Sequence, residues 1–91
     1  MARATNKLTA LQVSKIKTPG RYGDGNGLYL QVKSGGTKSW LYRFMLEGRA
    51  RMMGLGAVGD VSLAEARVLA TAARKLLRSG VDPLDAKRAE R

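Results

Sequence analysis

The sequence predicts an α+β fold: a three-stranded antiparallel sheet packed against a C-terminal helix, with a short N-terminal helix. Two patterns support this prediction. Residues 28–33, 39–46 and 49–56 alternate between two sets of side chains with the period of two that is typical of strands, and short turn-forming segments separate them. Residues 62–79 instead repeat apolar side chains every three or four positions, which indicates an amphipathic helix. At 91 residues, the chain is long enough for one compact domain with a modest core.

The first expected element is a short helix over the segment ALQVSKIK. Thr9 precedes this segment and is a good N-cap residue. Pro19 and Gly20 follow it, and both are poor helix formers. The helix is therefore expected to end before the segment TPGR at residues 18–21.

A glycine-rich stretch, GDGNG at residues 23–27, comes next. A dinucleotide-binding loop has the spacing G-x-G-x-x-G and leads into a helix, because the helix N-terminus faces the pyrophosphate. Here the spacing is G-x-G-x-G, and the alternating segment LYLQVK follows. We therefore interpret the stretch as a turn that leads into a strand, and expect no small-molecule substrate there.

The last two strands are expected to form a hairpin about a two-residue turn at Glu47-Gly48. In that register Leu46 pairs with Arg49, Arg43 with Met52, Tyr42 with Met53, and Trp40 with Leu55. Residues opposite one another share a face of the sheet. The expected core face consists of Trp40, Tyr42, Met53 and Leu55 with Leu28, Leu30 and Val32. The expected free face consists of Leu41, Arg43, Met45, Ala50, Met52 and Gly54 with Tyr29, Gln31 and Lys33.

The long helix has clear end signals. Ser62 and Glu65 form a capping box, and Gly80 suits the position after the helix. Its expected apolar stripe is Leu63, Ala66, Leu69, Ala70, Ala73, Leu76 and Leu77. A further helix restarts at Asp82-Pro83 but carries little apolar surface. We therefore expect residues 1–80 to form the domain and residues 81–91 to begin a linker to further domains.

Composition excludes several functions. The chain has no cysteine and no histidine, which removes disulfides, thiol nucleophiles, zinc fingers and Ser-His-Asp hydrolysis. Turn or capping positions are expected for Asp24, Glu47, Asp60 and Glu65. We therefore predict no catalytic residue, no metal ligand and no cofactor. No apolar run approaches the roughly 20 residues of a membrane span, and the N-terminus lacks the apolar core of a signal peptide. A cytoplasmic protein without a membrane partner is expected.

The charge balance predicts a polyanionic partner. Seventeen Lys and Arg face seven Asp and Glu, a net charge of +10, and such a basic small domain is typical of nucleic-acid binding. The free face of the sheet fits the major groove of double-stranded DNA. Arg43 is expected to read guanine and Gln31 adenine, while Tyr29 contacts a phosphate or stacks. The remaining expected contacts are phosphate contacts from Lys15, Lys17, Lys33, Lys38 and Arg49, and methyl contacts from Met45 and Met52.

Two other functions are compatible with the same residues. Leu41, Met45 and Met52 are apolar and share the expected free face, which also suits a protein-interaction or self-association module. RNA recognition on a sheet usually needs exposed aromatic side chains for stacking, and only Tyr29 qualifies here.

Taken together, these segments resemble the N-terminal arm-type DNA-binding domain of tyrosine-recombinase integrases, which prophages and genomic islands carry. The resemblance runs from about Leu8 to Arg88 and rests on the order and spacing of LT, DGNGLYLQV, KSWLYRF, MGLG, VSLAEAR and GVDP. It implies a three-stranded sheet that enters the major groove at arm-type sites of attachment DNA, during integration and excision of a mobile element. It also implies that the catalytic Arg, His and Tyr belong to a later domain, so this chain is expected to bind DNA without cutting it.

The sequence departs from this family at two places. Met45 and Met52 stand where the resemblance implies Arg or Lys, and Val58-Gly59 stands in place of Tyr-Pro. The departures imply weaker binding, more dependence on methyl contacts, or help from Lys7, Lys15 and Lys17 of the first helix region.

Overall fold

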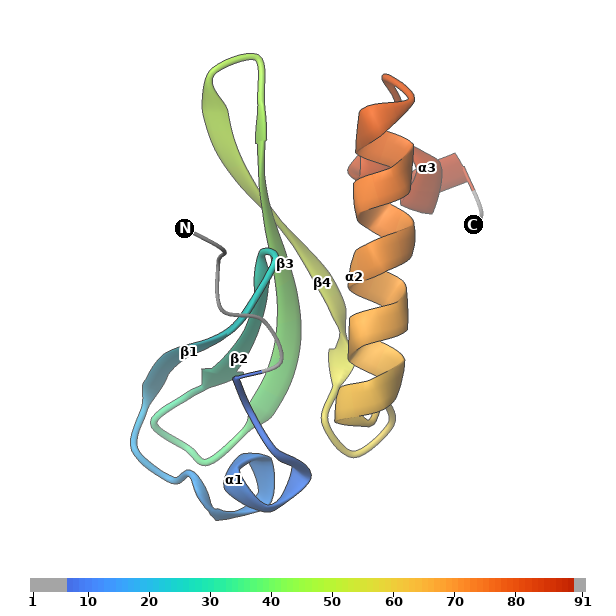
Figure 1. The fold of residues 1–91 in the computed structure, drawn as a ribbon. Helices are drawn as coiled ribbons and strands as arrows, with labels where there is room; N and C mark the ends of the chain where they lie inside the picture. The colour runs from blue at the N-terminus through green and yellow to red at the C-terminus, as the bar shows by residue number, and fades with distance from the viewer. Residues whose placement is uncertain (1–6, 90–91) are drawn as a thin grey trace.

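The computed structural model describes residues 7–89 and shows a four-stranded antiparallel sheet with helices on one face (Figure 1). The strands lie in the order β1-β2-β3-β4, so each pairs with its neighbour in the chain. The α+β class is confirmed, but the expected three-stranded sheet is wrong. In chain order the elements are α1 (Ala10–Lys15), β1 (Gly20–Gly25), β2 (Leu28–Val32), β3 (Lys38–Leu46), β4 (Arg49–Ala57), α2 (Leu63–Arg78) and α3 (Pro83–Ala89).

The additional strand, β1, lies in a segment whose residues are typical of turns. Its sequence, GRYGDG, has no apolar alternation, and half of its residues are exposed at the sheet edge. Pairing with β2 holds it extended, with Tyr22 opposite Leu30. Asn26 and Gly27 connect the two strands as a two-residue turn, and both have positive φ, at 55° and 86°. Asn-Gly is a strong hairpin signal. The interpretation of residues 23–27 as a turn before a strand did not use this signal, and so it did not predict the strand that precedes the turn.

Gly27 is a position where a side chain is strongly disfavoured. Its φ is +86°, and a Cβ there would lie 2.5 Å from the carbonyl oxygen of Arg43. Gly48 occupies the equivalent place in the β3–β4 turn with φ +78°, but nothing lies within 4 Å of a Cβ there. We expect Gly27→Ala to lower the free energy of unfolding by about 1–3 kcal/mol more than Gly48→Ala, because only Gly27 adds a backbone collision to the positive φ. Urea denaturation of both variants measures this difference, and equal losses would contradict it.

The register of the β3–β4 hairpin follows the prediction up to one bulge. Leu46 pairs with Arg49, Arg43 with Met52 and Tyr42 with Met53, as expected. Trp40, however, lies opposite Gly56 rather than Leu55, because the register shifts between Trp40 and Leu41. Leu55 is the extra residue of a β-bulge. Such bulges bend an edge strand, and this one lies where β4 turns toward α2.

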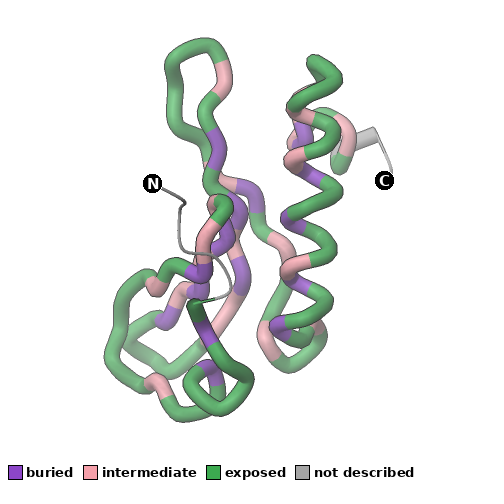
Figure 2. Tube along the Cα trace, viewed as in Figure 1, coloured by how far each residue is buried: buried purple, intermediate pink, exposed green. Residues whose placement is uncertain are grey.

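The core lies between one face of the sheet and the helices (Figure 2). Trp40 and Leu30 are 0% exposed, and Trp40 Nε1 donates to the Val61 carbonyl at 2.7 Å. Small side chains on α2, including Ala66 and Ala70, let that helix pack closely. The predicted caps are both present, with Thr9 before α1 and Ser62 before α2.

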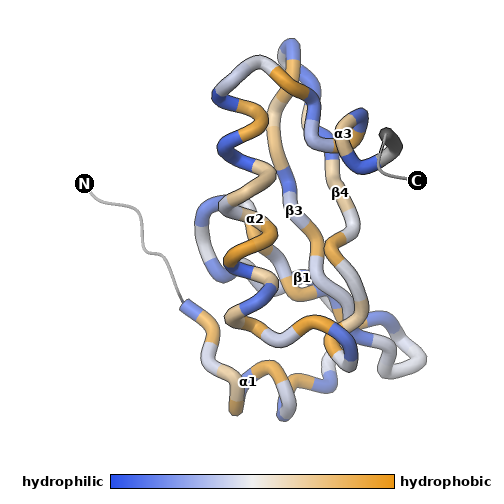
Figure 3. The backbone as a smooth tube through the Cα atoms, turned by 90° about the vertical axis from the view of Figure 1, so that its right-hand side faces the viewer, coloured by the Kyte–Doolittle hydropathy of each residue, from blue (hydrophilic) through white to orange (hydrophobic). Residues whose placement is uncertain are grey.

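The apolar stripe of α2 is narrower than the sequence predicts. Leu63, Ala66, Ala70 and Ala73 are buried, whereas Leu69 is 41% and Leu76 36% exposed. In Figure 3, apolar and polar segments alternate along α2, as in an amphipathic helix at a surface. Leu69 and Leu76 face α3 and β4 across a shallow groove because the helix turns them away from the centre of the sheet.

The last described helix, α3, is attached to the domain by polar contacts and by Pro83, which is buried. Asp82 Oδ2 lies 2.6 Å from Arg51 Nη1, and Lys87 Nζ donates to the Gly54 carbonyl at 2.6 Å. Arg51 pairs with Phe44 on the helix-covered side, as its position in the strand predicts. That residues 81–91 begin a linker stays a prediction, and residues 90–91 lie outside the described part.

Candidate nucleic-acid interface

No helix of the described residues covers the second face of the sheet. Cross-strand pairs place Arg21 opposite Gln31, Tyr29 opposite Leu41, and Arg43 opposite Met52 on this side. We call this surface the open face; it consists of Arg21, Gly23, Tyr29, Gln31, Ser39, Leu41, Arg43, Met45, Ala50, Met52 and Gly54. None of these residues is Asp or Glu. The open face thus combines polar and apolar side chains, and its charged residues, Arg21 and Arg43, are both positive.

Part of the open face lies on a projecting hairpin (Figure 1). The pairing of β2 with β3 ends at Leu28 and Tyr42. The Arg43 amide then donates to the Gly27 carbonyl at 2.7 Å, and beyond it β3 pairs only with β4. A two-stranded ribbon of this kind fits the major groove of B-DNA. Arg43 lies at the base of the ribbon, and Met45 lies further out, where it is 53% exposed.

The structure brings together five of the predicted contact residues. Tyr29, Gln31, Arg43, Met45 and Met52 all lie on the open face, because strand alternation was assigned in the correct phase.

Sequence reasoning missed Arg21, which lies exposed on the same face beside Gln31. The Asn-Gly turn was the signal that could have found it, since a two-residue hairpin turn sets the pairing of the strand before it.

Lys38 does not lie on the open face. It lies opposite Val32 on the side that the helices cover. Its ammonium donates to the carbonyls of Val13 at 2.8 Å and Ser14 at 3.1 Å, at the C-terminal end of α1. A cation there is favourable for the helix dipole. Lys38 therefore holds α1 on the sheet, and we leave it out of the interface.

The other four predicted cations lie outside the open face. Lys33 is exposed directly after β2, where the chain turns toward β3. Arg49 is exposed beside the β3–β4 turn, and it pairs with Leu46, which packs against the core, so its register position is on the helix-covered side. Lys15 and Lys17 are exposed at the end of α1. The structure does not bring these four side chains into one cluster.

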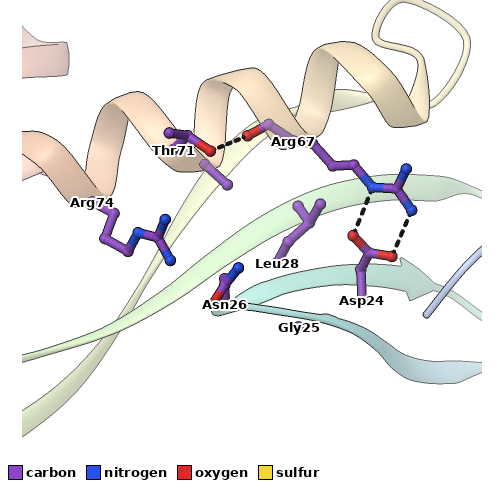
Figure 4. Close-up of a pocket in the computed structure, with 8 residues that line it drawn as sticks. Asp24, Gly25, Asn26, Leu28, Arg67, Thr71 and Arg74 are labelled. Carbon is purple, nitrogen blue, oxygen red and sulfur yellow. Dashed lines mark hydrogen bonds and ion pairs between the residues drawn. The ribbon is translucent and has the colours of Figure 1, made fainter. Parts of the chain in front are cut away.

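A buried ion pair lies on the helix-covered side (Figure 4). Asp24, which is 2% exposed, accepts from Arg67 Nε at 2.9 Å and from Arg67 Nη2 at 3.0 Å. Its carboxylate also accepts from the Leu8 amide at 2.9 Å, and Arg67 Nη2 donates to the Leu8 carbonyl at 2.8 Å. The pair therefore ties the chain before α1 to both β1 and α2.

The ion pair controls the titration of Asp24. Burial raises the pKa of Asp24, but the hydrogen bonds from Arg67 and Leu8 and the charge of Arg67 together hold it below the ordinary value of 3.8. The register of β1 shifts between Gly23 and Gly25, so Asp24 is the extra residue of a bulge that aims its side chain inward. The adjacent cavity is only ≈50 Å³. We interpret this cluster as structural, not as a ligand site.

Within residues 7–89, no group of three His, Cys, Asp or Glu lies close enough together to hold a metal ion. No helix in this range is long and apolar enough to cross a membrane.

An exposed sheet face bordered by Lys and Arg on a small basic domain defines a class of nucleic-acid-binding modules. The chain belongs to the Arm DNA-binding domain family, whose model matches residues 8–90. It is 40% identical over 85 residues to an integrase of Shigella phage Sf6 and, separately, to the prophage integrase IntS of Escherichia coli K12. The integrase of Enterobacteria phage P4 is 38% identical over 82 residues. These matches confirm the resemblance to the arm-type domain of integrases.

The matches cover most of this chain but little of the relatives. The first two alignments include 90% of the chain and 22% of each relative, and the phage P4 alignment includes 85% and 19%. The chain thus corresponds to about a fifth of the length of these integrases.

Proposed function

We propose that this domain binds arm-type sites of attachment DNA sequence-specifically, as the N-terminal module of a tyrosine recombinase that integrates and excises a mobile element. One observation carries the proposal: the open face has no carboxylate and extends onto a projecting two-stranded ribbon. Family membership makes DNA the partner. The integrase names of the relatives support recombination as the process that the binding serves.

In the proposed complex, the ribbon enters the major groove with its open face toward the bases. Arg43 donates two hydrogen bonds to guanine O6 and N7, and Gln31 reads adenine. Arg21, beside Gln31, contacts a base or the adjoining phosphate. Met45 and Met52 contact thymine methyl groups.

Lys15, Lys17, Lys33 and Arg49 contact phosphates around this surface. Such contacts position the protein on the duplex without reading its sequence.

The domain itself is proposed to bind without cleaving. It lacks histidine, and none of its tyrosines has a general base beside it in the sequence. The catalytic residues of the parent recombinase would then lie in the part of the protein that residues 81–91 lead toward.

A salt titration tests the proposal. If four to six phosphates are neutralised, the logarithm of the affinity for duplex DNA should fall against the logarithm of salt concentration with a slope of roughly −3.6 to −5.4. Fluorescence anisotropy with a labelled duplex measures this slope, and single-stranded DNA and RNA of the same sequence serve as controls. A flat salt response would exclude binding to a polyanion, and tighter binding to RNA would exclude the duplex assignment.

The apolar residues of the open face also make self-association testable. Sedimentation of the free domain is expected to show a monomer. A dimer that DNA dissociates would assign Leu41, Met45 and Met52 to a protein interface instead.

A further inference from the structure

The sheet has a notch where β3 continues past the turn between β1 and β2. Its volume is ≈440 Å³, within the range of sites that accept small ligands. Tyr29, Arg43 and Met45 line it from the open face. Arg74 and Leu77 of α2 line it from the opposite side. The notch therefore connects the open face with the helix layer around the edge of β3.

Arg74 lines this notch and, within residues 7–89, makes no hydrogen bond or ion pair with an anionic partner. The residue as a whole is partly buried. It extends from α2 toward the strands on the side of Asn26 (Figure 4). It lies before the last turn of α2, whose cations are Lys75 and Arg78, so stabilisation of the helix dipole does not explain it.

The chemistry of the notch favours an anion. Two of its lining residues, Arg43 and Arg74, are cations, Asn26 supplies an amide, and none of the lining residues is acidic. Burial raises the pKa of Tyr42, and the positive charge of Arg74 acts in the opposite direction, so that charge reaches the wall of the notch. A guanidinium forks onto phosphate oxygens with two charge-assisted hydrogen bonds.

We propose that the notch binds a phosphodiester of the same duplex whose major groove the open face enters, with Arg74 as the principal contact and the Asn26 amide beside it. This inference rests on the proposed function. The DNA backbones border the major groove, so a ribbon inserted there passes beside a phosphate at its edge. Residues of both the open face and α2 line the notch, so DNA bound to the open face would also contact α2 there. The DNA would thus touch both layers of the domain.

Arg74→Gln and a matched control, Arg78→Gln, test the proposal. Arg78 has the same charge one turn further along α2 and is exposed outside the notch. Binding is measured by anisotropy at several salt concentrations. The two probes are a duplex that the wild-type domain has selected from a randomised library and a random duplex.

We expect Arg74→Gln to weaken binding to both duplexes about 3- to 10-fold and to reduce the steepness of the salt slope by about 0.9, the loss of one phosphate contact. Arg78→Gln should weaken binding less than about twofold, because an exposed charge away from the DNA is screened by salt. Arg74→Lys keeps the charge and should retain the wild-type salt slope with part of the affinity. This result would show that the weaker binding of Arg74→Gln does not come from a folding defect.

Methylphosphonate substitution of single phosphates adds an independent readout. One neutralised position should weaken the wild-type domain and leave Arg74→Gln unchanged. Two outcomes would show that the notch is not a phosphate site: equal binding by Arg74→Gln and Arg78→Gln, or the absence of any such phosphate position. If the wild type still binds with a steep salt slope, the proposed function stands. If the wild-type domain fails to bind duplex DNA, the proposed function fails first.

Discussion

Replacing Asp24 by Ala is expected to lower the free energy of unfolding by about 3 kcal/mol. Breaking a buried ion pair costs about 3–5 kcal/mol, and we expect the lower end because the Arg67 side chain is still 32% exposed to water. The change removes three hydrogen bonds to the carboxylate, from Arg67 Nε, Arg67 Nη2 and the Leu8 amide. A domain of this size has a total stability of about 5–15 kcal/mol, so the loss should be evident in the urea midpoint.

A matched variant separates this effect from the loss of any carboxylate. Asp60 is exposed in the turn before α2, and Asp60→Ala should change the free energy of unfolding by less than about 0.5 kcal/mol. Similar losses at both positions would show that the Asp24–Arg67 pair does not hold the fold. Combining Asp24→Ala with Arg67→Ala should cost less than the sum of the single changes, because the two side chains share their contacts.

The same ion pair predicts an acid dependence of stability. The pKa of Asp24 is lower in the folded state than the ordinary value of 3.8. Its contribution is therefore complete above about pH 5, and it is lost as the pH falls through 3.8 and then through the lower folded value. The fall in unfolding free energy below pH 4 should be shallower in Asp24→Asn than in the wild type. Urea denaturation at a series of pH values measures both curves, and parallel curves would contradict the lowered pKa.

Replacing Arg43 by Ala is expected to cost about 1–3 kcal/mol of binding free energy on the selected duplex and to relax its preference at one base pair. Arg43 lies on the open face at the base of the projecting ribbon, opposite Met52. The variant would lose the proposed bidentate contact to guanine. The measured quantity is the ratio of affinities for the selected and the random duplex, which should fall.

Lys33→Ala is the control for this prediction. Lys33 lies after β2 at the border of the open face, where a phosphate contact is expected, so both affinities should fall together and their ratio should stay constant. Lys38 is unsuitable as this control, because its loss would also release the end of α1. An unchanged ratio for Arg43→Ala would mean that the open face does not read bases.

Local chemistry determined the helix caps and the register of the β3–β4 hairpin. Thr9 and Ser62 cap their helices because their side chains reach a backbone amide three residues on. The two-residue turn at Glu47-Gly48 set the pairing of Arg43 with Met52, since strand alternation and a fixed loop length leave one register. The open face and the five residues on it that we propose as DNA contacts were predictable for the same reason.

The tertiary structure decided what no local pattern carried. β1 has no apolar alternation of its own, so it becomes a strand only by pairing with β2, and Arg21 reaches the open face with it. The bulge at Asp24 aims its carboxylate at Arg67 of α2, which lies 43 residues away in the sequence. The bulge at Leu55 shifts the register of β4 against β3 beside Trp40. Lys38 shares the helix-covered face with Trp40, and the packing of α1 against the sheet places the Val13 and Ser14 carbonyls where its ammonium donates to them. Sequence alone therefore determined which residues of β2, β3 and β4 share a face, whereas packing between elements decided which charged side chains remain exposed for the proposed DNA contacts.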